Sequence, residues 1–455
     1  MAHLLLDEIV RATGGKILGA DHGEFTGLSI DSRTIRDGEL FVALKGENFD
    51  GHNFLRDALK KASGAMVHAA PEEVPAGKTI VLVRDTLAAL QDIARALRLS
   101  REVPVIAVTG TNGKTTTKEL VAAVLGAKGK VLKTQGNFNN HIGLPLCLCR
   151  MERDESAMVL EMGSNAEGDI ALLCGIARPD FAVVTNVGPA HLEGFGSIET
   201  VRKTDLEVLD YVKTVAVNAD DLFLLEGIGE FKGKVITYGI DNRADVQAVD
   251  IDLRDRGSRF SIRFPDGGML SIDLRLSGRF NIYNALAAAS VGDALGVGRE
   301  EIKRGLESFG GVPMRLEVRE ISGALIINDV YNANPASMDE ALKELIRLKR
   351  RRAIAVLGDM LELGRHSESA HRSLVEGLSR SGIDMLIAVG EEMKKASSVF
   401  TGKCYRADGP AAAGEILSGL LAEGDTVLIK GSRGMRMEKV LSENGKKTGG
   451  QDHAL

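Results

Sequence analysis

The chain is poor in cysteine, and its cysteines do not have the paired spacing of a metal site. The four of them, among 455 residues, are Cys147, Cys149, Cys174 and Cys404. Cys147 and Cys149 lie in an apolar segment, where a thiol ordinarily packs as a small hydrophobic side chain. The pattern therefore indicates packed thiols rather than a zinc site, and a reducing cytoplasm is the expected setting.

The chain also lacks long hydrophobic runs and an excess of basic residues. No apolar run approaches the ~18 residues of a membrane-spanning helix, so no membrane insertion is expected. Residues 1–8 have neither the basic leader nor the apolar core of a signal peptide. A net charge of −6 and a pI of about 5.9 argue against nonspecific binding to nucleic acid or anionic membranes. Any phosphate binding must therefore be local.

The composition that is present suits a globular protein with several cores. One core rarely grows beyond ~250–300 residues, so a chain of 455 residues is expected to form about three domains. Hydrophobic residues make up 44% of the chain, which supplies ample apolar material for these cores.

The segment 107–119 has the order of a strand, a glycine-rich loop and a helix. The apolar run Val103–Val108 precedes the loop Gly110-Thr-Asn-Gly-Lys-Thr115, and apolar residues recur after it. In such a loop, backbone N–H groups and a helix N-terminus can cradle phosphates. Lys114 is expected to reach the outer phosphates, and the Thr115 hydroxyl to hold a magnesium ion. The chain is therefore predicted to bind ATP and Mg²⁺.

This loop is shorter than the full P-loop, because Val108 stands where that motif has its first glycine. A plain turn of the same sequence is the alternative interpretation. The strand before the loop and the helix after it favour phosphate binding.

Turn signals divide the chain into three predicted α/β domains. Residues 1–84 mix short apolar runs with turns, residues 85–312 contain the phosphate loop, and residues 313–455 follow a Gly-Gly-Val-Pro joint. Strands alternate with helix-length segments in the second and third domains, as in a parallel sheet with crossover helices. The tail from residue 443 is polar and is expected to be disordered.

The expected strands are short apolar runs bounded by polar or turn residues. In the second domain they are 103–108, 131–133, 158–161 and 181–185, and in the third 324–328, 353–357, 385–389 and 426–429. Helices are expected over 85–99 and 337–349, and the segment 246–276 alternates like antiparallel strands.

Polar residues follow several of these strands. Glu161 ends an apolar strand beside the phosphate loop, where a magnesium ligand is needed, although an acid can simply end a strand. His191 follows the next strand and is a candidate ligand, with a structural histidine as the alternative. Asn137, Asn139 and Asn140 suit recognition of a sugar or peptide, although asparagine-rich turns are common.

Together these motifs resemble those of the Mur ligase family of ATP-dependent amide-forming enzymes. The matching segments run in family order across nearly the whole chain, and they are 110–115, 137–140, 160–163, 186–192, 278–288, 314–315, 329–335, 357–364 and 430–434. Segments 331–335 and 358–364 are most similar to the member that adds D-alanyl-D-alanine, as are the N-terminal segments 29–33 and 49–52.

The resemblance implies a fold and a reaction. The fold is a small N-terminal α/β nucleotide-sugar domain, a central P-loop-type parallel-sheet domain and a C-terminal Rossmann-like domain. The reaction joins D-alanyl-D-alanine to UDP-N-acetylmuramoyl-tripeptide through an acyl phosphate, and it releases ADP and phosphate. The resemblance also favours a monomer, with no nucleic-acid partner.

The resemblance further implies roles for individual residues. Catalysis would depend on Lys114, Glu161, His191 and Arg315. Nucleotide binding would involve Gly110, Thr111, Asn112, Gly113, Lys114, Thr115, Thr116, Asn284, Arg315, Asp329, Tyr331 and Asn332. Substrate binding would involve Ser32, Arg33, Asp50, Gly51, His52, Asn137, Asn139, Asn140, Asn334, Lys430, Ser432 and Arg433. Metal ligands would be Thr115, Glu161, His191 and Asp205.

Two positions depart from the family pattern. Asp205 stands where the family has a carbamylated lysine that ligates magnesium, and Lys203 is about 200° around the helix from it. Asp205 could ligate magnesium or its water shell directly, and a solvated acid on a helix face is the alternative. Phe280 replaces the histidine that usually precedes Asn281.

Other functions stay open on the sequence alone. Folylpolyglutamate synthase is a related amide ligase, but it would begin near its phosphate loop and lack the first 84 residues. A P-loop ATPase or kinase is a rival from another class, and an inactive homologue is a third possibility suggested by Asp205. The third residue of the tripeptide, meso-diaminopimelate or lysine, is not determined by any short motif.

Overall fold

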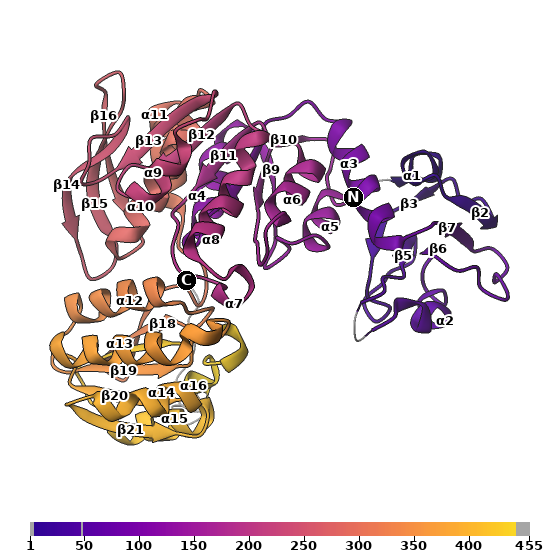
Figure 1. Ribbon diagram of the computed structural model, residues 1–455. Helices are drawn as coiled ribbons and strands as arrows, with labels where there is room; N and C mark the ends of the chain where they lie inside the picture. Colours follow the sequence, from indigo (N-terminus) through magenta and orange to yellow (C-terminus); the bar gives the residue numbers. More distant parts are fainter. Residues whose placement is uncertain (1–3, 47–48, 443–455) are drawn as a thin grey trace.

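The computed structural model describes residues 4–46 and 49–442. The described residues form three main β-sheets, each covered by helices, which follow one another along the chain (Figure 1). The tail expected to be disordered, 443–455, lies outside the described residues. The predicted domain boundaries at 84/85 and 312/313 fall between the sheets, and their standing as boundaries stays a prediction.

The N-terminal sheet has the order β2-β7-β6-β5-β4, in which β2 is antiparallel to β7 and the other pairs are parallel. Its strands are β2 (Lys16–Gly19), β4 (Gly27–Ser29), β5 (Glu39–Val42), β6 (Gly64–Val67) and β7 (Thr79–Leu82), with a separate pairing of β1 (Leu4–Leu5) and β3 (Glu24–Phe25). Helix α1 (Leu6–Thr13) buries Leu6 and Ile9 on one face. It ends at Gly14, whose φ of 65° is the left-handed conformation that glycine adopts readily at helix ends.

The central sheet has the order β16-β15-β14-β13-β12-β11-β8-β10-β9, and it is parallel from β9 to β14. Its parallel strands are β8 (Val105–Thr109), β9 (Lys130–Lys133), β10 (Glu155–Glu161), β11 (Phe181–Val184), β12 (Thr214–Asn218), β13 (Lys234–Gly239) and β14 (Val246–Leu253). The predicted antiparallel strands are confirmed as β14, β15 (Ser258–Arg263) and β16 (Met269–Leu274).

The two faces of the central sheet belong to different apolar clusters. Ile106 and Val108 of β8 pack with α4 (Lys114–Leu125), α10 (Arg279–Ala294) and α11 (Arg299–Ser308). Val105 and Ala107 point the other way, towards α3 (Thr86–Leu99), α5 (Gly143–Leu148) and α6 (Asp169–Ala177). Because successive side chains of a strand face opposite sides, a strand buried on both faces is apolar throughout. The cluster around α3 continues into α1, so the N-terminal and central parts share a core.

The C-terminal sheet has the order β17-β18-β22-β19-β20-β21, with β17 antiparallel to β18 and the rest parallel. Its strands are β17 (Glu317–Ile321), β18 (Ala324–Asp329), β19 (Ala353–Gly358), β20 (Met385–Val389), β21 (Lys403–Ala407) and β22 (Thr426–Lys430). The four expected strands are confirmed. The edge strands β17 and β21 were not expected, because exposed polar residues such as Arg319 and Arg406 hide their pattern.

The remaining helices connect these strands. They are α2 (Leu55–Ala58), α7 (Leu192–Phe195), α8 (Ile198–Leu206), α9 (Leu222–Ile228), α12 (Pro335–Arg347), α13 (Ser367–Arg380), α14 (Glu391–Ala396), α15 (Pro410–Leu420) and α16 (Lys439–Ser442), with short 3-10 turns at 51–54, 126–128, 207–210, 364–366, 397–399 and 433–435. Helix α12 begins two residues before the expected position, because Asn334 caps it and Pro335 occupies its first turn.

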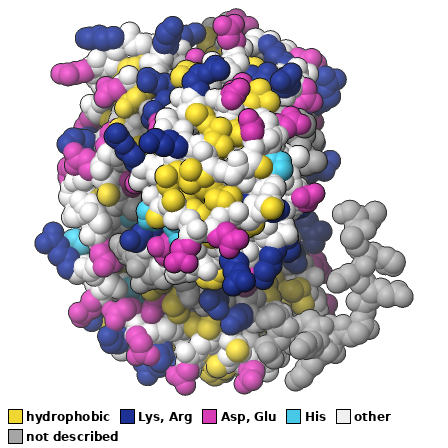
Figure 2. Space-filling model, turned by 90° about the vertical axis from the view of Figure 1, so that its right-hand side faces the viewer, with side chains coloured by type: hydrophobic (Ala, Val, Ile, Leu, Met, Phe, Trp, Pro, Cys, Tyr) yellow, Lys and Arg dark blue, Asp and Glu magenta, His cyan; other side chains and the backbone are white. Residues whose placement is uncertain are grey.

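The surface is mixed in charge. Figure 2 shows the end of the molecule that carries the N-terminal sheet, where basic and acidic side chains are interspersed around a gathering of hydrophobic ones. Within the described part of the chain, no helix is both long and apolar enough to cross a membrane.

Candidate active site at the phosphate loop

The phosphate loop connects β8 to α4, as the sequence predicts. Gly110 and Gly113 have φ values of 115° and 82°, which side chains rarely adopt. A Cβ atom at Gly110 would collide with the Thr185 hydroxyl, and one at Gly113 would press on the Asn284 amide. Glycine is therefore required at both positions by conformation and by space. Helix α4 then begins at Lys114, so its N-terminal N–H groups face the loop.

Lys114 lies folded over its own loop. Its amine donates to the carbonyl oxygens of Gly110 and of Thr111, the latter at 3.1 Å. Burial lowers the pKa of Lys114, and the carboxylates of Asp205 and Glu161 oppose that shift. The amine therefore interacts with two acids at the place where an anionic ligand would add further negative charge.

Asp205 is buried directly beneath the loop. Its carboxylate accepts hydrogen bonds from the Thr109 hydroxyl at 2.8 Å and the Gly110 N–H at 3.2 Å, and only 2% of the residue is exposed. Burial raises the pKa of Asp205 to about 6, although nearby Lys114 lowers it. The alternative of a solvated helix-face acid is therefore wrong, because α8 turns this position towards the loop. Lys203 lies elsewhere on α8, exposed and paired with Glu167.

Glu161 ends β10 next to the loop. One oxygen, Oε1, accepts a hydrogen bond from the Asn139 amide at 2.9 Å. The other, Oε2, is buried and has no hydrogen-bond partner among the described residues. A buried carboxylate oxygen without a partner is costly, so this atom is suited to a cation.

His191 lies in the loop after β11 and makes a contact across the two domains. Its φ of 50° is left-handed, and its Nδ1 lies 2.7 Å from Oε2 of Glu362, which is itself left-handed with φ 63°. Burial lowers the pKa of His191, while Glu362 raises it. Glu362 lies in the segment 358–364 that carries the family resemblance, but no role was predicted for it. Helix α7, which starts after His191, lies at the junction of the central and C-terminal parts (Figure 1).

Two side chains of the C-terminal part contact the phosphate loop. The Arg315 guanidinium donates to the Thr115 hydroxyl at 2.9 Å, and the Asn334 amide donates to Oδ1 of Asn112 at 2.9 Å. The Asn112 backbone is held in turn by the side chain of Asn186, which accepts from its N–H and donates to its carbonyl oxygen, each at 3.0 Å. The sequence did not predict a role for Asn186, although it follows β11 in the segment before His191.

Tyr331 lies between two guanidinium groups. The Arg315 guanidinium carbon is 4.0 Å from the ring centroid and that of Arg433 is 5.9 Å. Contacts of this kind favour both the charge and the position of the cations. The ring therefore supports Arg315 in its approach to Thr115.

The other C-terminal candidates hold one another in place. The Lys430 amine, buried, donates to Oδ2 of Asp329 at 2.6 Å and to the Asn332 carbonyl at 2.9 Å. The Ser432 hydroxyl accepts from the Leu361 N–H at 2.8 Å and donates to the Ala333 carbonyl oxygen at 3.3 Å. These contacts fix the segment 329–334 that carries Tyr331 and Asn334.

Asn284 and Thr116, the remaining residues expected to bind the nucleotide, lie around α4. Asn284 is buried on α10 below Gly113, where its amide accepts from the Thr117 hydroxyl and donates to Asn281, both at 3.1 Å. Thr116 is partly buried in the first turn of α4. Phe280, which replaces the usual histidine, packs against the C-terminal core.

The three asparagines expected to bind substrate are not equivalent. Asn139 contacts Glu161, Asn137 is exposed, and Asn140 accepts from the N–H groups of Ile142 and Gly143 at the start of α5. A small cavity of about 120 Å³ lies beside them, lined by Asn140, His141, Gly163, Asn165, Asp169 and Leu173.

The N-terminal candidates lie on a separate part of the molecule. Asp50 accepts from the N–H and the Nδ1 of His52, and Nε2 of His52 accepts from the His68 N–H at 3.1 Å. A Cβ atom at Gly51 would collide with the Leu44 backbone. Arg33 is exposed beside the partly exposed Ser32, and its guanidinium holds the pKa of Asp31 down at about 2.

Sequence models of three family regions match the chain in succession. They are the "Mur ligase family, catalytic domain" over residues 24–98, the "Mur ligase middle domain" over 108–292 and the "Mur ligase, glutamate ligase domain" over 314–433. The chain belongs to the Mur ligase family, and the resemblance is confirmed.

Individual relatives are similar over nearly their whole length. The chain is 37% identical to the UDP-N-acetylmuramoyl-tripeptide–D-alanyl-D-alanine ligase of Bacillus subtilis, over 92% of each chain. It is 35% identical to the ligase of the same name from Escherichia coli, over 98% of this chain and 100% of that one.

Solved structures give the same result for the fold. MurF from Acinetobacter baumannii has a TM-score of 0.90 and is 30% identical, over 97% of this chain and 98% of that one. MurF ligase from Thermotoga maritima in complex with ADP has a TM-score of 0.82 and is 32% identical, over 93% and 98%. A folylpolyglutamate synthase from Mycobacterium tuberculosis is 15% identical with a TM-score of 0.64, which shows the fold alone. The predicted fold class is confirmed.

Proposed function

We propose that this chain is an ATP-dependent amide ligase that joins D-alanyl-D-alanine to UDP-N-acetylmuramoyl-tripeptide. The product is the UDP-N-acetylmuramoyl-pentapeptide of peptidoglycan biosynthesis. The relatives from Bacillus subtilis and Escherichia coli carry this activity in their names. The observation that carries the proposal is the contact of Arg315 and Asn334 with the phosphate loop. A ligase must bring a nucleotide, an acid and an amine together, and this site combines side chains of two domains.

In the proposed reaction a terminal carboxylate oxygen of the tripeptide attacks the γ-phosphorus of ATP. The bond from that phosphorus to the β–γ bridging oxygen breaks, which leaves an acyl phosphate and ADP. The amine of D-alanyl-D-alanine then attacks the acyl carbon and loses a proton, and phosphate departs as the amide forms. Lys114 and Arg315 act by offsetting the charge on the transferred phosphoryl group, and the backbone of the loop by positioning it.

Magnesium is part of this proposal. Thr115 and Glu161 offer hard oxygen ligands, and the orphaned Oε2 of Glu161 fits a cation. The described residues contain no group of three His, Cys, Asp or Glu side chains placed to hold a metal. Mg²⁺ keeps several waters and substrate phosphates as ligands, so two protein oxygens suffice. Bound there, the ion would neutralise phosphate charge.

His191 and Asp205 are proposed to contribute to the metal environment. Glu362 holds Nδ1 of His191 and leaves Nε2 available, which is the usual arrangement of a carboxylate behind a metal-binding histidine. Asp205 has the charge for this role, but Thr109 and Gly110 already occupy one of its oxygens.

Substrate binding and location complete the proposal. The uridine diphosphate group is assigned to Ser32, Arg33, Asp50, Gly51 and His52 of the N-terminal domain. The peptide parts are assigned to Asn137, Asn139 and Asn140 of the central domain and to Asn334, Lys430, Ser432 and Arg433 of the C-terminal domain. The enzyme is proposed to act in the cytoplasm, since ATP and a UDP-linked precursor are its substrates, and as a monomer, which the family resemblance favours.

The test is phosphate release from ATP and Mg²⁺ with UDP-N-acetylmuramoyl-tripeptide, with and without D-alanyl-D-alanine. Release that requires both substrates, with a pentapeptide product by mass spectrometry, is expected. ATP hydrolysis independent of either substrate would support a P-loop ATPase and reject the ligase. Comparing tripeptides with meso-diaminopimelate or lysine identifies the preferred third residue.

A magnesium titration tests the metal ligands. Glu161→Gln is expected to raise the Mg²⁺ concentration at half-maximal activity about tenfold, because an amide oxygen is a weaker ligand than a carboxylate. An unchanged titration would remove Glu161 from the metal site.

Asp205→Asn in the same titration decides whether Asp205 is a ligand, since Asn keeps a hydrogen-bond acceptor beneath the loop.

A further inference from the structure

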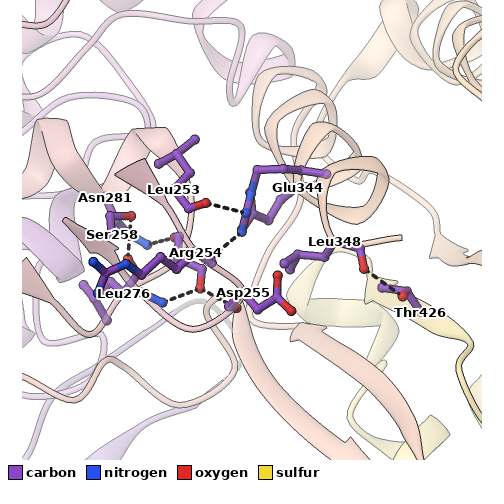
Figure 3. Close-up of polar contacts among 12 residues, drawn as sticks. Leu253, Arg254, Asp255, Ser258, Leu276, Asn281, Glu344, Leu348 and Thr426 are labelled. Carbon is purple, nitrogen blue, oxygen red and sulfur yellow. Dashed lines mark hydrogen bonds and ion pairs between the residues drawn. The ribbon is translucent and has the colours of Figure 1, made fainter. Parts of the chain in front are cut away.

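Helix α12 contacts the central domain at both of its ends. At its start, Asn334 reaches Asn112 in the phosphate loop. At its end, the Arg347 guanidinium donates to the backbone carbonyl oxygens of Leu253 at 3.3 Å and Arg254 at 2.8 Å (Figure 3). These carbonyls belong to the turn between β14 and β15, which we call the 253–258 turn.

Glu344 orients the Arg347 guanidinium for this contact. It makes a two-point contact with Glu344, from Nε at 2.8 Å and from Nη2 at 2.7 Å, and Glu344 is only 4% exposed. The Leu348 carbonyl, one residue further on, accepts from the Thr426 hydroxyl of β22 at 3.0 Å. Glu344 therefore holds the guanidinium on α12, and Leu348 connects the end of that helix to the C-terminal sheet.

The 253–258 turn is fixed to the elements that carry the phosphate loop. The Ser277 hydroxyl accepts from the Gly257 N–H at 3.0 Å and donates to the Asp255 carbonyl at 3.1 Å. The Asn281 amide donates to the Ser277 carbonyl at 2.7 Å and accepts from Asn284 at 3.1 Å. Asn284 lies directly below Gly113 and contacts Thr117 of α4. The Thr117 N–H donates to the Gly113 carbonyl oxygen at 2.8 Å, so hydrogen bonds lead from the turn through α10 and α4 to the loop.

We propose that Arg347 is a positioning residue, which docks the C-terminal domain on the 253–258 turn and so orients Arg315 and Asn334 for the reaction. The inference rests on the proposed function, because it concerns closure for the same reaction. Helix α12 has 13 residues and is about 20 Å long, so its two contacts are far apart. The contacts that Arg315, Asn334 and His191 make across the two domains lie at the edge that carries the phosphate loop, whereas Arg347 holds the far end of α12 and so fixes the direction of the helix.

The surrounding ion pairs do not fix that orientation. Arg350 lies 3.8 Å from Asp255, and Arg256 lies 3.6 Å from Glu320, but all four side chains are 41–65% exposed. Exposed pairs of this length contribute little. Arg347, by contrast, is largely shielded and donates to two backbone carbonyl oxygens of the turn.

Arg347→Lys is the first test, because it keeps a charge beside Glu344 but cannot serve Glu344 and both carbonyls together. We expect kcat to fall about tenfold with KM for ATP within twofold, since Arg347 does not touch the nucleotide. Arg347→Ala with Glu344→Ala removes the pair without leaving a buried charge, and a larger loss is expected. Arg372→Lys is the matched control, because its pair with Glu376 on α13 faces solvent. A kcat within twofold of the wild type for Arg347→Lys and for the double variant Arg347→Ala with Glu344→Ala would overturn the proposal.

A second readout does not depend on activity. Hydrogen exchange of the 253–258 turn should accelerate in Arg347→Lys and stay unchanged in Arg372→Lys. Ser277→Ala should lower kcat in the wild type and have little further effect in Arg347→Lys. If Ser277→Ala lowers kcat by the same factor in Arg347→Lys as in the wild type, the turn does not act through Arg347. If the wild type forms no pentapeptide, the proposed function fails, while the exchange result still decides whether Arg347 docks the domain.

Discussion

At the scale of single residues, the site gathers basic and acidic side chains around the phosphate loop. The carboxylates of Asp205 and Glu161 interact with Lys114, and Arg315 approaches from the other domain. Glu161 and Asp205 offset these two cations, so bound phosphates would add negative charge, which Mg²⁺ would offset. Catalytic power here comes from placing these charges in advance.

Lys114→Ala should lower kcat at least about 10³-fold, the scale on which cations that stabilise phosphoryl transfer act. The melting temperature should stay near that of the wild type, because the amine contacts only loop carbonyls. Steady-state phosphate release and circular dichroism measure the two quantities. Lys128→Ala is a control on an exposed lysine, and normal turnover of Lys114→Ala would contradict the assigned role.

Asp205 gives a pH-dependent prediction. Its folded-state pKa of about 6 lies above the usual 3.8, so the free energy of unfolding falls as the pH rises from about 3.8 to about 6, and the full cost of the buried charge remains above that range. Asp205→Asn keeps an acceptor for Thr109 and Gly110 but has no charge. Its free energy of unfolding relative to the wild type should therefore be higher at pH 8 than at pH 5, by on the order of 1 kcal/mol. Equal differences at the two pH values, measured by denaturant titration, would refute the buried-charge interpretation.

At the scale of elements, loops at the carboxyl ends of strands carry the site, and helix ends support it. Parallel strands place these ends on one edge, so β8, β10 and β11 bring Gly110, Glu161 and His191 together. Helix α12 adds its capped N-terminus to this edge from the other domain.

Asn334 has two separable roles in α12. Its Oδ1 caps the helix by accepting from the Ser337 N–H at 2.8 Å, and its amide donates to Asn112. Asn334→Ser keeps a capping oxygen but is too short to reach Asn112, so stability should be nearly unchanged while kcat/KM falls about tenfold. Asn334→Ala should lose both, with about 1 kcal/mol of stability. Equal kcat/KM for Asn334→Ser and the wild type would show that the Asn112 contact is dispensable.

At the scale of the whole molecule, nucleotide binding and domain docking share the same atoms. Thr115 and Asn112 belong to the phosphate loop, and Arg315 and Asn334 reach them from the C-terminal part. A ligand at the loop is therefore expected to order both domains.

A non-hydrolysable ATP analogue with Mg²⁺ should slow hydrogen exchange at residues 110–115 and also at 329–334. The physical reason is that Arg315 and Tyr331 pack together, so fixing one fixes the segment of the other. Lys114→Ala should lose protection at both places. Protection limited to the loop would show that the C-terminal domain does not respond to the nucleotide.

The sequence was sufficient for features that depend on local spacing. The phosphate loop, the alternation of strands and helices, and the antiparallel segment after residue 246 follow from residue order within a few turns of chain. The first residue of a helix was predicted less well, since α12, which Asn334 caps, begins two residues before the expected start. The edge strands β17 and β21 were missed because of their exposed polar residues. Strand β12, with its apolar run Val215–Val217, could have been expected.

Only the tertiary structure decided which residues meet across domains. Arg315 and Thr115 are 200 residues apart, and no spacing rule predicts that they lie 2.9 Å from one another. The partnership of His191 with Glu362, the burial of Asp205 and the docking of Arg347 on the 253–258 turn were likewise invisible in the sequence. Each depends on how packed helices and sheets orient whole domains, and that orientation is set by many weak contacts rather than by any local pattern.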